Sequence, residues 1–178
     1  MKSACFTGHR ILIGDINGLK DCLFAKLADM ACNEGYTDFY AGGALGWDMI
    51  AEESVIALKE KYHFIKLDLV LPCSSEEQTS KWNRKQKERY LRILSAADSI
   101  EYISEHYEDD CMKKRNQRLV DLSECCLCFW NEENRASGTS QTVRMALDKG
   151  IEVLNFYGSS GVRSFRLKTD KKHNVAEE

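Results

Sequence analysis

The sequence lacks the features of a membrane-spanning, exported or generally nucleic-acid-binding chain. No apolar run approaches the roughly 18 to 20 residues that a membrane span needs. The first six residues, MKSACF, are followed at once by a polar segment, which argues against a signal peptide. The 25 Lys and Arg residues are outnumbered by 28 Asp and Glu residues, so the formal net charge of -3 gives no overall basic field. We therefore expect a cytoplasmic protein with no membrane partner.

Proline is scarce as well, because Pro72 is the only one in 178 residues, and no linker, repeat or low-complexity tract interrupts the chain. This length suits one domain. We predict that residues 1–157 form that domain and that residues 158–178 form a basic C-terminal tail or short extension. Within the tail, residues 164–169 are a candidate arm of a hairpin.

Cysteine is present in number, with eight residues. Without a signal peptide they are expected to be free thiols in a reducing compartment. The tightest group is Cys125, Cys126 and Cys128, and it lies in an apolar run without a nearby histidine, which does not suit a metal site. Because successive strand residues face opposite ways, Cys126 and Cys128 should share a face that Cys125 does not. We predict buried small hydrophobic residues and assign no metal ion.

Short apolar runs alternate with longer segments of helical period along the whole chain. Helical spacing is clearest in Leu19, Leu23, Leu27 and Met30, and Gly35 follows where a helix C-cap would lie. This alternation predicts an α/β fold, a parallel sheet covered on both faces by crossover helices. The expected strands are residues 3–7, 38–41, 66–71, 99–103, 125–130 and 151–156, and the expected helices are residues 19–30, 49–58, 82–97, 111–122 and 139–149.

The first predicted strand ends in a polar segment made of Thr7, Gly8, His9 and Arg10. Glycine lets a chain approach a ligand closely, and the planar guanidinium of arginine suits a phosphate or a carboxylate. In open parallel sheets the ligand crevice lies beyond the carboxyl ends of the strands. The segment is therefore a candidate for ligand binding.

The second predicted strand leads into a glycine-rich turn that contains Gly42, Gly43 and Gly46 and opens a helix. Unpaired amides and the helix dipole attract anions at such a position. Asp48 either caps this helix or holds a ribose hydroxyl. The spacing matches neither a dinucleotide fingerprint nor a P-loop, so the pattern favours an anion without naming it.

The fifth predicted strand is followed by a second glycine-led helix start, at Gly138 and Thr139. Because the carboxyl ends of parallel strands meet at one edge, we expect this start to meet the two earlier segments there. Residues 113–118 are basic, and they are either a solvated face or a source of inward-pointing Arg115 and Asn116. Residues 81–92 are also basic and are interpreted as solvated surface.

Taken together, these segments resemble the YpsA-like SLOG family, in the wider group that contains DprA/Smf and the LOG proteins. The resemblance implies a three-layer α/β/α Rossmann-like domain with a six-stranded parallel sheet in the order 3-2-1-4-5-6. It also implies a pocket for a nucleotide or a nucleotide-derived ligand. The segments that carry it are FTGHR at 6–10, GGALGWD at 42–48, residues 72–82, RNQRLVD at 115–121 and SGT at 137–139.

The chain departs from the LOG phosphoribohydrolases at one position that matters for activity. Those enzymes carry Pro-Gly-Gly-x-Gly-Thr-x-x-Glu, and alignment on Gly138 and Thr139 places Thr142 where the glutamate should stand. A carboxylate that would assist cleavage of the glycosidic bond is missing there. We therefore expect no hydrolysis of the LOG type, and we assign no cofactor and no catalytic residue.

Three functions follow as hypotheses. The leading one is binding or sensing of a nucleotide-derived small molecule. The second is an N-glycosidase or phosphoribohydrolase that uses His9, Asp48 or Glu132 in place of the missing glutamate. The third is single-stranded nucleic-acid binding of the DprA kind through residues 113–118 and the tail, which the net charge of -3 disfavours. The sequence does not decide whether the protein forms a homo-oligomer.

Overall fold

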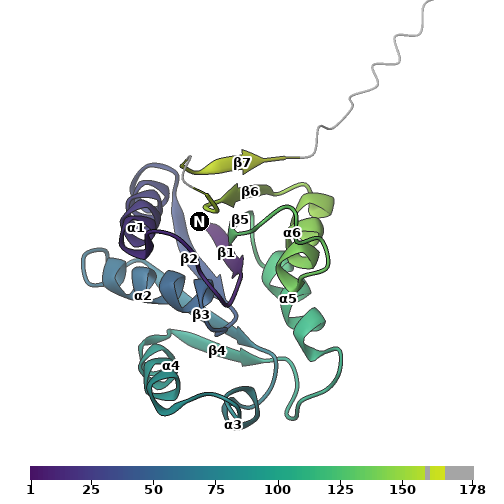
Figure 1. The fold of residues 1–178 in the computed structure, drawn as a ribbon. Coiled ribbons are helices and arrows are strands. Elements are labelled where there is room, and N and C mark those ends of the chain that lie inside the picture. The colour runs from purple at the N-terminus through teal and green to yellow at the C-terminus, as the bar shows by residue number, and fades with distance from the viewer. Residues whose placement is uncertain (159–160, 167–178) are drawn as a thin grey trace, which may run out of the picture.

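A central sheet of seven strands runs through the computed structural model, which describes residues 1–158 and 161–166 (Figure 1). The strand order is β4-β3-β2-β1-β5-β6-β7. Every neighbouring pair is parallel except β6 and β7, which are antiparallel. The predicted α/β class is confirmed. The strands are β1 (Lys2–Gly8), β2 (Tyr36–Ala41), β3 (Lys66–Leu71), β4 (Ser99–Tyr102), β5 (Cys125–Phe129), β6 (Glu152–Asn155) and β7 (Arg163–Phe165).

Two details of the expected topology are wrong. The sheet has seven strands and not six, and the fourth strand lies at the edge beside β3 instead of next to β1. All four residues of β4 are exposed, which suits an edge, whereas all five residues of β5 are buried, which suits the centre. Asp98 fixes the edge position, because its amide donates to the carbonyl of Leu67 and its carboxylate accepts from the amide of Leu67.

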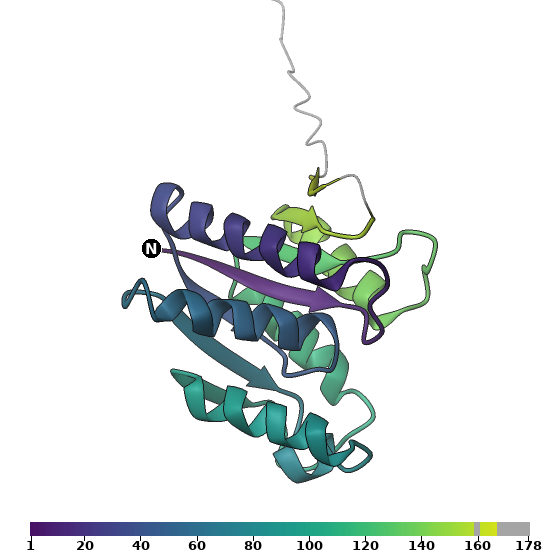
Figure 2. The same ribbon diagram turned by 60° about the vertical axis from the view of Figure 1, so that its left-hand side comes forward.

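Helices cover the two faces of the sheet unequally (Figures 1 and 2). On one face α2 contacts both α1 and α4, and on the other face α5 packs against α6. A short helix, α3, lies at the carboxyl edge. The expected three-layer arrangement is thus present. The helices are α1 (Ile16–Asn33), α2 (Trp47–Lys59), α3 (Ser75–Gln78), α4 (Arg84–Ala96), α5 (Cys111–Asp121) and α6 (Gly138–Lys149).

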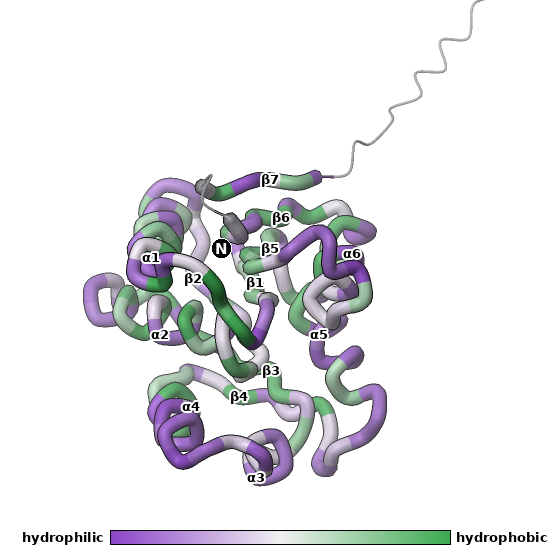
Figure 3. Tube along the Cα trace, in the orientation of Figure 1, coloured by the Kyte–Doolittle hydropathy of each residue, from purple (hydrophilic) through white to green (hydrophobic). Residues whose placement is uncertain are grey.

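Hydrophobic residues gather along the strands and the inner sides of the helices (Figure 3). The larger core, under α1, α2 and α4, contains Phe6, Phe39 and Trp47. The smaller core, under α5 and α6, contains Cys126 and Cys128. Cys125 belongs to the larger core, so the predicted division of these three cysteines between the two faces is confirmed. The eight cysteines of the chain are free thiols.

The helices have the expected positions, with small differences at their ends. Helix α1 buries Leu23, Leu27 and Met30, and Gly35 follows its C-cap residue, as the spacing predicts. Helix α3 was not predicted, because four residues are too few to show a helical period. In the described residues no helix is long and apolar enough to cross a membrane.

Strand β7 pairs in antiparallel fashion with β6 through Phe165, Ser164 and Arg163. The expected hairpin arm at residues 164–169 therefore begins in β7, and its last three residues lie outside the described part of the chain. The proposed boundary between a domain at 1–157 and a tail at 158–178 stays a prediction. The described segment 163–165 is an edge strand of the same sheet.

Candidate functional site

A hollow of about 330 Å³ lies at the carboxyl ends of β1 and β5. After β1 the chain continues into α1 on one face of the sheet, and after the neighbouring strand β5 it continues into α6 on the other face. In α/β folds a ligand crevice opens where two neighbouring strands connect to helices on opposite faces. The structure brings nine of the twelve predicted site residues to this hollow. They are Thr7, Gly8, His9, Arg10, Asp48, Arg115, Asn116, Gly138 and Thr139.

His9 connects the end of β1 to the loop after β5. Its ring Nε2 accepts a hydrogen bond of 2.9 Å from the amide of Asn131, so the proton of the neutral ring is assigned to Nδ1. The ring meets Phe129 and Tyr157 edge-on, with centroids 6.4 and 6.3 Å away. Burial lowers the pKa of His9, which favours the neutral form. His9 therefore holds two loops together and presents no positive charge near neutral pH.

Arg115 is the buried cation of the site. Its Nη1 lies 3.5 Å from Oδ2 of Asp48, and its buried Nε has no hydrogen-bond partner. A Cβ atom at residue 42 would overlap the Arg115 guanidinium, so Gly42 provides the space in which this group lies. A buried donor without a partner is unfavourable by about 1 to 3 kcal/mol, so the hydrogen-bonding capacity of this guanidinium is incompletely satisfied.

The rest of the basic segment 113–118 divides by helical face. Asn116 is buried next to Arg115 and lines the hollow. Lys114 faces outward and pairs with Glu108 and Asp110, while Arg118 pairs with Glu101. The segment is therefore not a continuous field of unpaired positive charge.

Asp48 and Glu52 lie one turn apart on α2, and both are buried. Burial raises the pKa of Asp48 to about 6, against the opposing effect of the Arg115 guanidinium. Burial and the nearby Asp48 carboxylate raise the pKa of Glu52 well above its usual range. Oε1 of Glu52 accepts a hydrogen bond of 2.9 Å from the amide of Gly43, and its Oε2 has no partner.

The glycine-rich turn before α2 does not offer the free amides that the sequence predicts. Glu52 occupies the amide of Gly43, and the side chain of Gln78 donates to the carbonyls of Gly42 and Gly43. Gly46 is the N-cap residue of α2 and no side chain caps it, so the capping alternative for Asp48 is not met; Oδ2 of Asp48 instead lies 3.4 Å from the amide of Ala44. Gly42, Gly43 and Gly46 do not line the hollow, and Ala44 is the residue of this turn that does.

The glycine-led start of α6 is open by comparison. Ser137 is the N-cap residue, and its hydroxyl accepts a hydrogen bond of 3.1 Å from the amide of Ser140. Within residues 1–158 and 161–166, no hydrogen bond occupies the amide of Gly138 or of Thr139. Thr142, at the position of the LOG glutamate, is fully buried and donates to the carbonyl of Gly138. No carboxylate stands there.

Three residues of the lining were not predicted, namely Ala44, Met112 and Ser137. Met112 lies one helical turn before Arg115, so its position on the same face of α5 could have been read from the spacing. Ser137 precedes Gly138 as a helix cap. Among the described residues, no group of three or more His, Cys, Asp and Glu side chains could hold a metal ion.

A second hollow of about 440 Å³ adjoins the first. Both are lined by Arg10, Ala44, Met112 and Arg115. The second is bounded in addition by Gln78, Lys81, Trp82 and Tyr107, among others. Arg10 is exposed at the border between them, so its guanidinium is accessible from both sides.

Comparisons with known proteins agree with this architecture. A family model for YpsA proteins, described as the YspA SLOG family, matches residues 14–166. The uncharacterized SPbeta prophage-derived protein YoqJ of Bacillus subtilis (strain 168) is 31% identical over 140 residues, which are 72% of this chain and 80% of YoqJ. A UPF0398 protein of Bacillus cereus (strain B4264) is 29% identical over 162 residues, which are 90% of this chain and 83% of that protein.

The X-ray structure of TM1055, a structural genomics target, superposes with a TM-score of 0.53 over 86% of this chain and 72% of that one. The sequences share 15% identity, so this likeness supports the fold alone. The family model, in contrast, spans most of the described chain and includes the segments after β2, β3 and β5. The resemblance expected from the motifs is confirmed, and the chain belongs to the YspA SLOG family.

Proposed function

We propose that the 330 Å³ hollow binds a phosphate-bearing small molecule of the nucleotide type. The observation that carries this proposal is the guanidinium of Arg115, which lines the hollow and whose ion pair with Asp48 is long, at 3.5 Å. Guanidinium groups bind phosphate through several parallel N–H donors. A phosphate in the hollow would accept hydrogen bonds from this guanidinium.

Two further features of the hollow support an anionic ligand. Arg10 lies at its mouth, and the N-terminus of α6 contributes the amides of Gly138 and Thr139 together with the positive end of a 12-residue helix. The opposing charge is the carboxylate of Asp48, which already pairs with Arg115. Its oxygens suit the hydroxyl groups of a ribose.

The sizes of the two adjoining hollows bear on how large the ligand is. Hollows of roughly 300 to 1,000 Å³ are typical of small-molecule sites. The first, at about 330 Å³, suits a sugar phosphate, and the second adds about 440 Å³. A larger nucleotide derivative such as ADP-ribose would extend from one to the other past Arg10.

Thermal unfolding in the presence of AMP, ADP-ribose, ribose 5-phosphate and adenosine tests the proposal. A ligand at about 100 times its dissociation constant stabilises the folded protein by about 2.7 kcal/mol. We expect the melting temperature to rise with at least one phosphate-bearing compound and not with adenosine, which lacks the phosphate. No change with any phosphate-bearing compound would contradict the proposal.

A matched pair of variants assigns the effect to the hollow. Arg10 and Arg92 are both exposed arginines, but Arg92 lies on α4 and lines neither hollow. We expect Arg10→Ala to reduce the ligand-induced rise in melting temperature and Arg92→Ala to leave it unchanged. An equal response of both variants would mean that the ligand binds through general surface charge.

Hydrolysis of an N-glycosidic bond is a second candidate, favoured by one observation. Asp48 is a buried carboxyl group with a pKa of about 6 that lines the hollow, as a general acid or base requires. The other two groups considered are less suited, because Nε2 of His9 already accepts a hydrogen bond and Glu132 pairs with Arg163.

Release of adenine from AMP at high protein concentration tests this second candidate. Turnover that Asp48→Asn abolishes, while AMP still raises the melting temperature of the variant, would support an acid–base role. Binding of AMP without any release of adenine would leave the protein a receptor. Within residues 113–118, Lys114, Arg115 and Arg118 are paired with carboxylates, so nucleic-acid binding is not proposed.

A further inference from the structure

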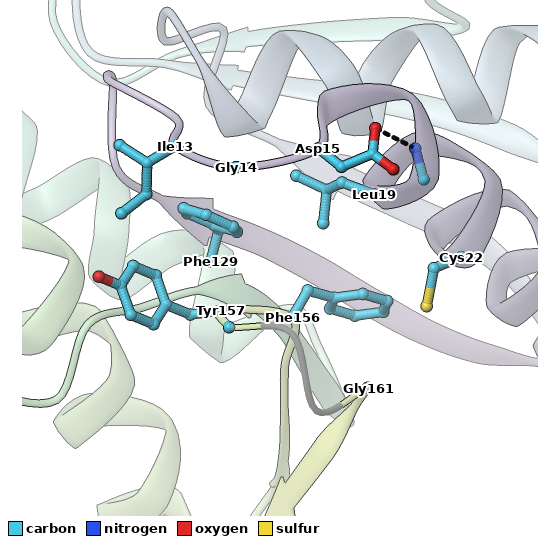
Figure 4. Close-up of a pocket in the computed structure, with 11 residues that line it drawn as sticks. Ile13, Gly14, Asp15, Leu19, Cys22, Phe129, Phe156, Tyr157 and Gly161 are labelled. Atoms are coloured by element: carbon cyan, nitrogen blue, oxygen red, sulfur yellow. Dashed lines mark hydrogen bonds between the residues drawn. The ribbon is translucent and has the colours of Figure 1, made fainter.

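A third hollow, larger than the two described above, lies outside the candidate site. It measures about 610 Å³ and opens between the first turn of α1 and the ends of β5 and β6 (Figure 4). It shares no lining residue with the 330 Å³ hollow. Its described lining consists of Ile13, Gly14, Asp15, Gly18, Leu19, Cys22, Phe129, Phe156, Tyr157, Gly158 and Gly161.

The walls of this hollow are aromatic and aliphatic. Phe129, Phe156 and Tyr157 line one side, and Ile13 and Leu19 line the other (Figure 4). The rings of Phe129 and Phe156 are buried, at 3% and 4% exposed, whereas Tyr157 and Leu19 are half-buried, so the accessible apolar surface of the hollow comes mainly from Tyr157, Leu19 and Ile13. Ile13 is 62% exposed, so a ligand there would remove apolar surface from water. Tyr157 is therefore the aromatic side chain against which a ligand ring would pack.

The charged residues that line the hollow indicate which substituent a bound ring would carry. Among the described residues that line the hollow there is no Lys, Arg or His, and Asp15 is the one carboxylate. Oδ1 of Asp15 caps α1 by accepting from the amides of Asn17 and Gly18, at 3.1 and 3.0 Å. Its Oδ2 accepts no hydrogen bond from the described chain.

The positive end of α1 is the competing influence, since it would favour an anion. A helix N-terminus carries about half a positive charge, whereas the carboxylate carries a full negative charge. Asp15 also uses two of the amides that would bind an anion. The balance at this hollow is therefore negative, opposite to that of the hollow lined by Arg10 and Arg115.

We propose that this hollow is a second small-molecule site, for a planar aromatic ring that bears an amino or amidine group. The ring would pack against Tyr157, Leu19 and Ile13, and the N–H donors would bind Oδ2 of Asp15. This site is independent of the proposed phosphate site and does not rest on it.

Two cysteines on α1 provide a direct test. Cys22 and Cys32 are both exposed thiols on the same helix, and only Cys22 lines the hollow. The rate of alkylation of each thiol by iodoacetamide is measured by peptide mass spectrometry, with and without 2-aminoquinoline. Quinoline-2-carboxylate, which has the same ring and the opposite charge, serves as the matched probe.

We expect 2-aminoquinoline, at about ten times its dissociation constant, to slow the alkylation of Cys22 about tenfold, as mass action requires for an occupied site. Cys32 should react at an unchanged rate, and quinoline-2-carboxylate should not protect Cys22. Asp15→Asn retains a good N-cap residue and removes the charge. In that variant we expect protection by the amine to weaken.

Several results would overturn this site. An unchanged Cys22 rate at all amine concentrations would show that no ring binds, and equal slowing of Cys32 would show non-specific binding. Equal protection by the carboxylate probe would contradict the charge assignment. If Cys22 is slowed by raising the protein concentration alone, and gel filtration shows a dimer, a second copy of the chain covers the hollow. None of these outcomes depends on whether AMP binds beside Arg115.

Discussion

Two helices of this protein begin at glycine-led turns at the same edge of the sheet, and they differ in what occupies their backbone amides. At the start of α2 the amide of Gly43 donates to Glu52, and the amide of Ala44 lies 3.4 Å from a carboxylate oxygen of Asp48. At the start of α6 the Ser137 hydroxyl accepts from the amide of Ser140, and the first two residues of the helix line a hollow with no hydrogen bond from their amides in the described chain.

The difference in amide occupancy between the two helix starts comes from the presence or absence of acidic side chains near the start of each helix and not from the glycines. Helix α2 carries two carboxyl groups at positions i and i+4, Asp48 and Glu52, and both point back toward the turn that precedes them. Helix α6 has no acidic residue in its first turn. A glycine-led helix start thus leaves its amides open to an external anion only where the chain supplies no anion of its own.

The largest effect is expected for Gly46→Ala, in the turn before α2. Gly46 has a φ of 84°, and an added Cβ would overlap the carbonyl oxygens of His9 and Arg10. These atoms belong to the backbone of the neighbouring loop and cannot rotate away. We expect the free energy of unfolding to fall by about 3 kcal/mol, measured by urea denaturation. A loss below about 1 kcal/mol would mean that this turn is far more adaptable than its geometry indicates.

The second effect concerns the carboxyl group that fills the α2 turn. Because the pKa of Glu52 is raised in the folded protein, the folded state favours the protonated form. The contribution of protonated Glu52 to stability is fully present below the pKa that Glu52 has in the unfolded chain. It is lost as the pH rises through the higher pKa that Glu52 has in the folded protein. Glu52→Gln has no proton to lose and preserves the acceptor for the amide of Gly43.

We therefore expect the unfolding free energy of Glu52→Gln to rise relative to wild type as the pH increases from 4.5, by up to about 1.4 kcal/mol per pH unit. Urea denaturation between pH 4 and pH 8 measures this difference. Glu60→Gln, which changes an exposed carboxyl group at the end of the same helix, is the control. A difference that stays constant across this range would show that Glu52 is ionised in the folded protein.

The third effect separates stability from binding at the start of α6. Ser137→Ala removes the N-cap side chain and should lower the unfolding free energy by about 1 kcal/mol. Ser137→Asp restores a good cap but adds a negative charge beside the hollow, so stability should return while the affinity for AMP falls about tenfold. Calorimetric titration measures the affinity. Unchanged affinity in Ser137→Asp would remove the α6 start from the phosphate site.

Local periodicity predicted the helices and most strands because it depends only on neighbouring residues. The spacing of Leu23, Leu27 and Met30 gives α1, and the unbroken apolar run from Cys125 gives β5. The edge position of β4 could not be predicted in this way, because the choice of neighbouring strand is a non-local property. The local sign that was available is its sequence, SIEY, which carries a charged residue and alternates polar and apolar residues, whereas the central strand β5 is apolar throughout.

The sequence predicted those parts of the candidate site that directly follow the carboxyl end of a strand. The segment after β1 and the start of α6 were found because the carboxyl ends of parallel strands share an edge. The occupied turn was not found, because nothing in the sequence indicates that Glu52 is buried while the adjacent Glu53 pairs with Arg89 at the surface. Which face of α2 enters the core depends on the position of the whole helix.

The smallest effect is expected for Gly138→Ala, the counterpart of Gly46→Ala in the other turn. An added Cβ at residue 138 meets no atom within 4 Å, and the residue begins a helix, where alanine is favoured over glycine. We expect the unfolding free energy to change by less than about 0.5 kcal/mol, with a small gain more consistent with the geometry than a loss. If Gly138→Ala were as damaging as Gly46→Ala, the start of α6 would be as tightly packed as that of α2, and the contrast between the two turns would fail.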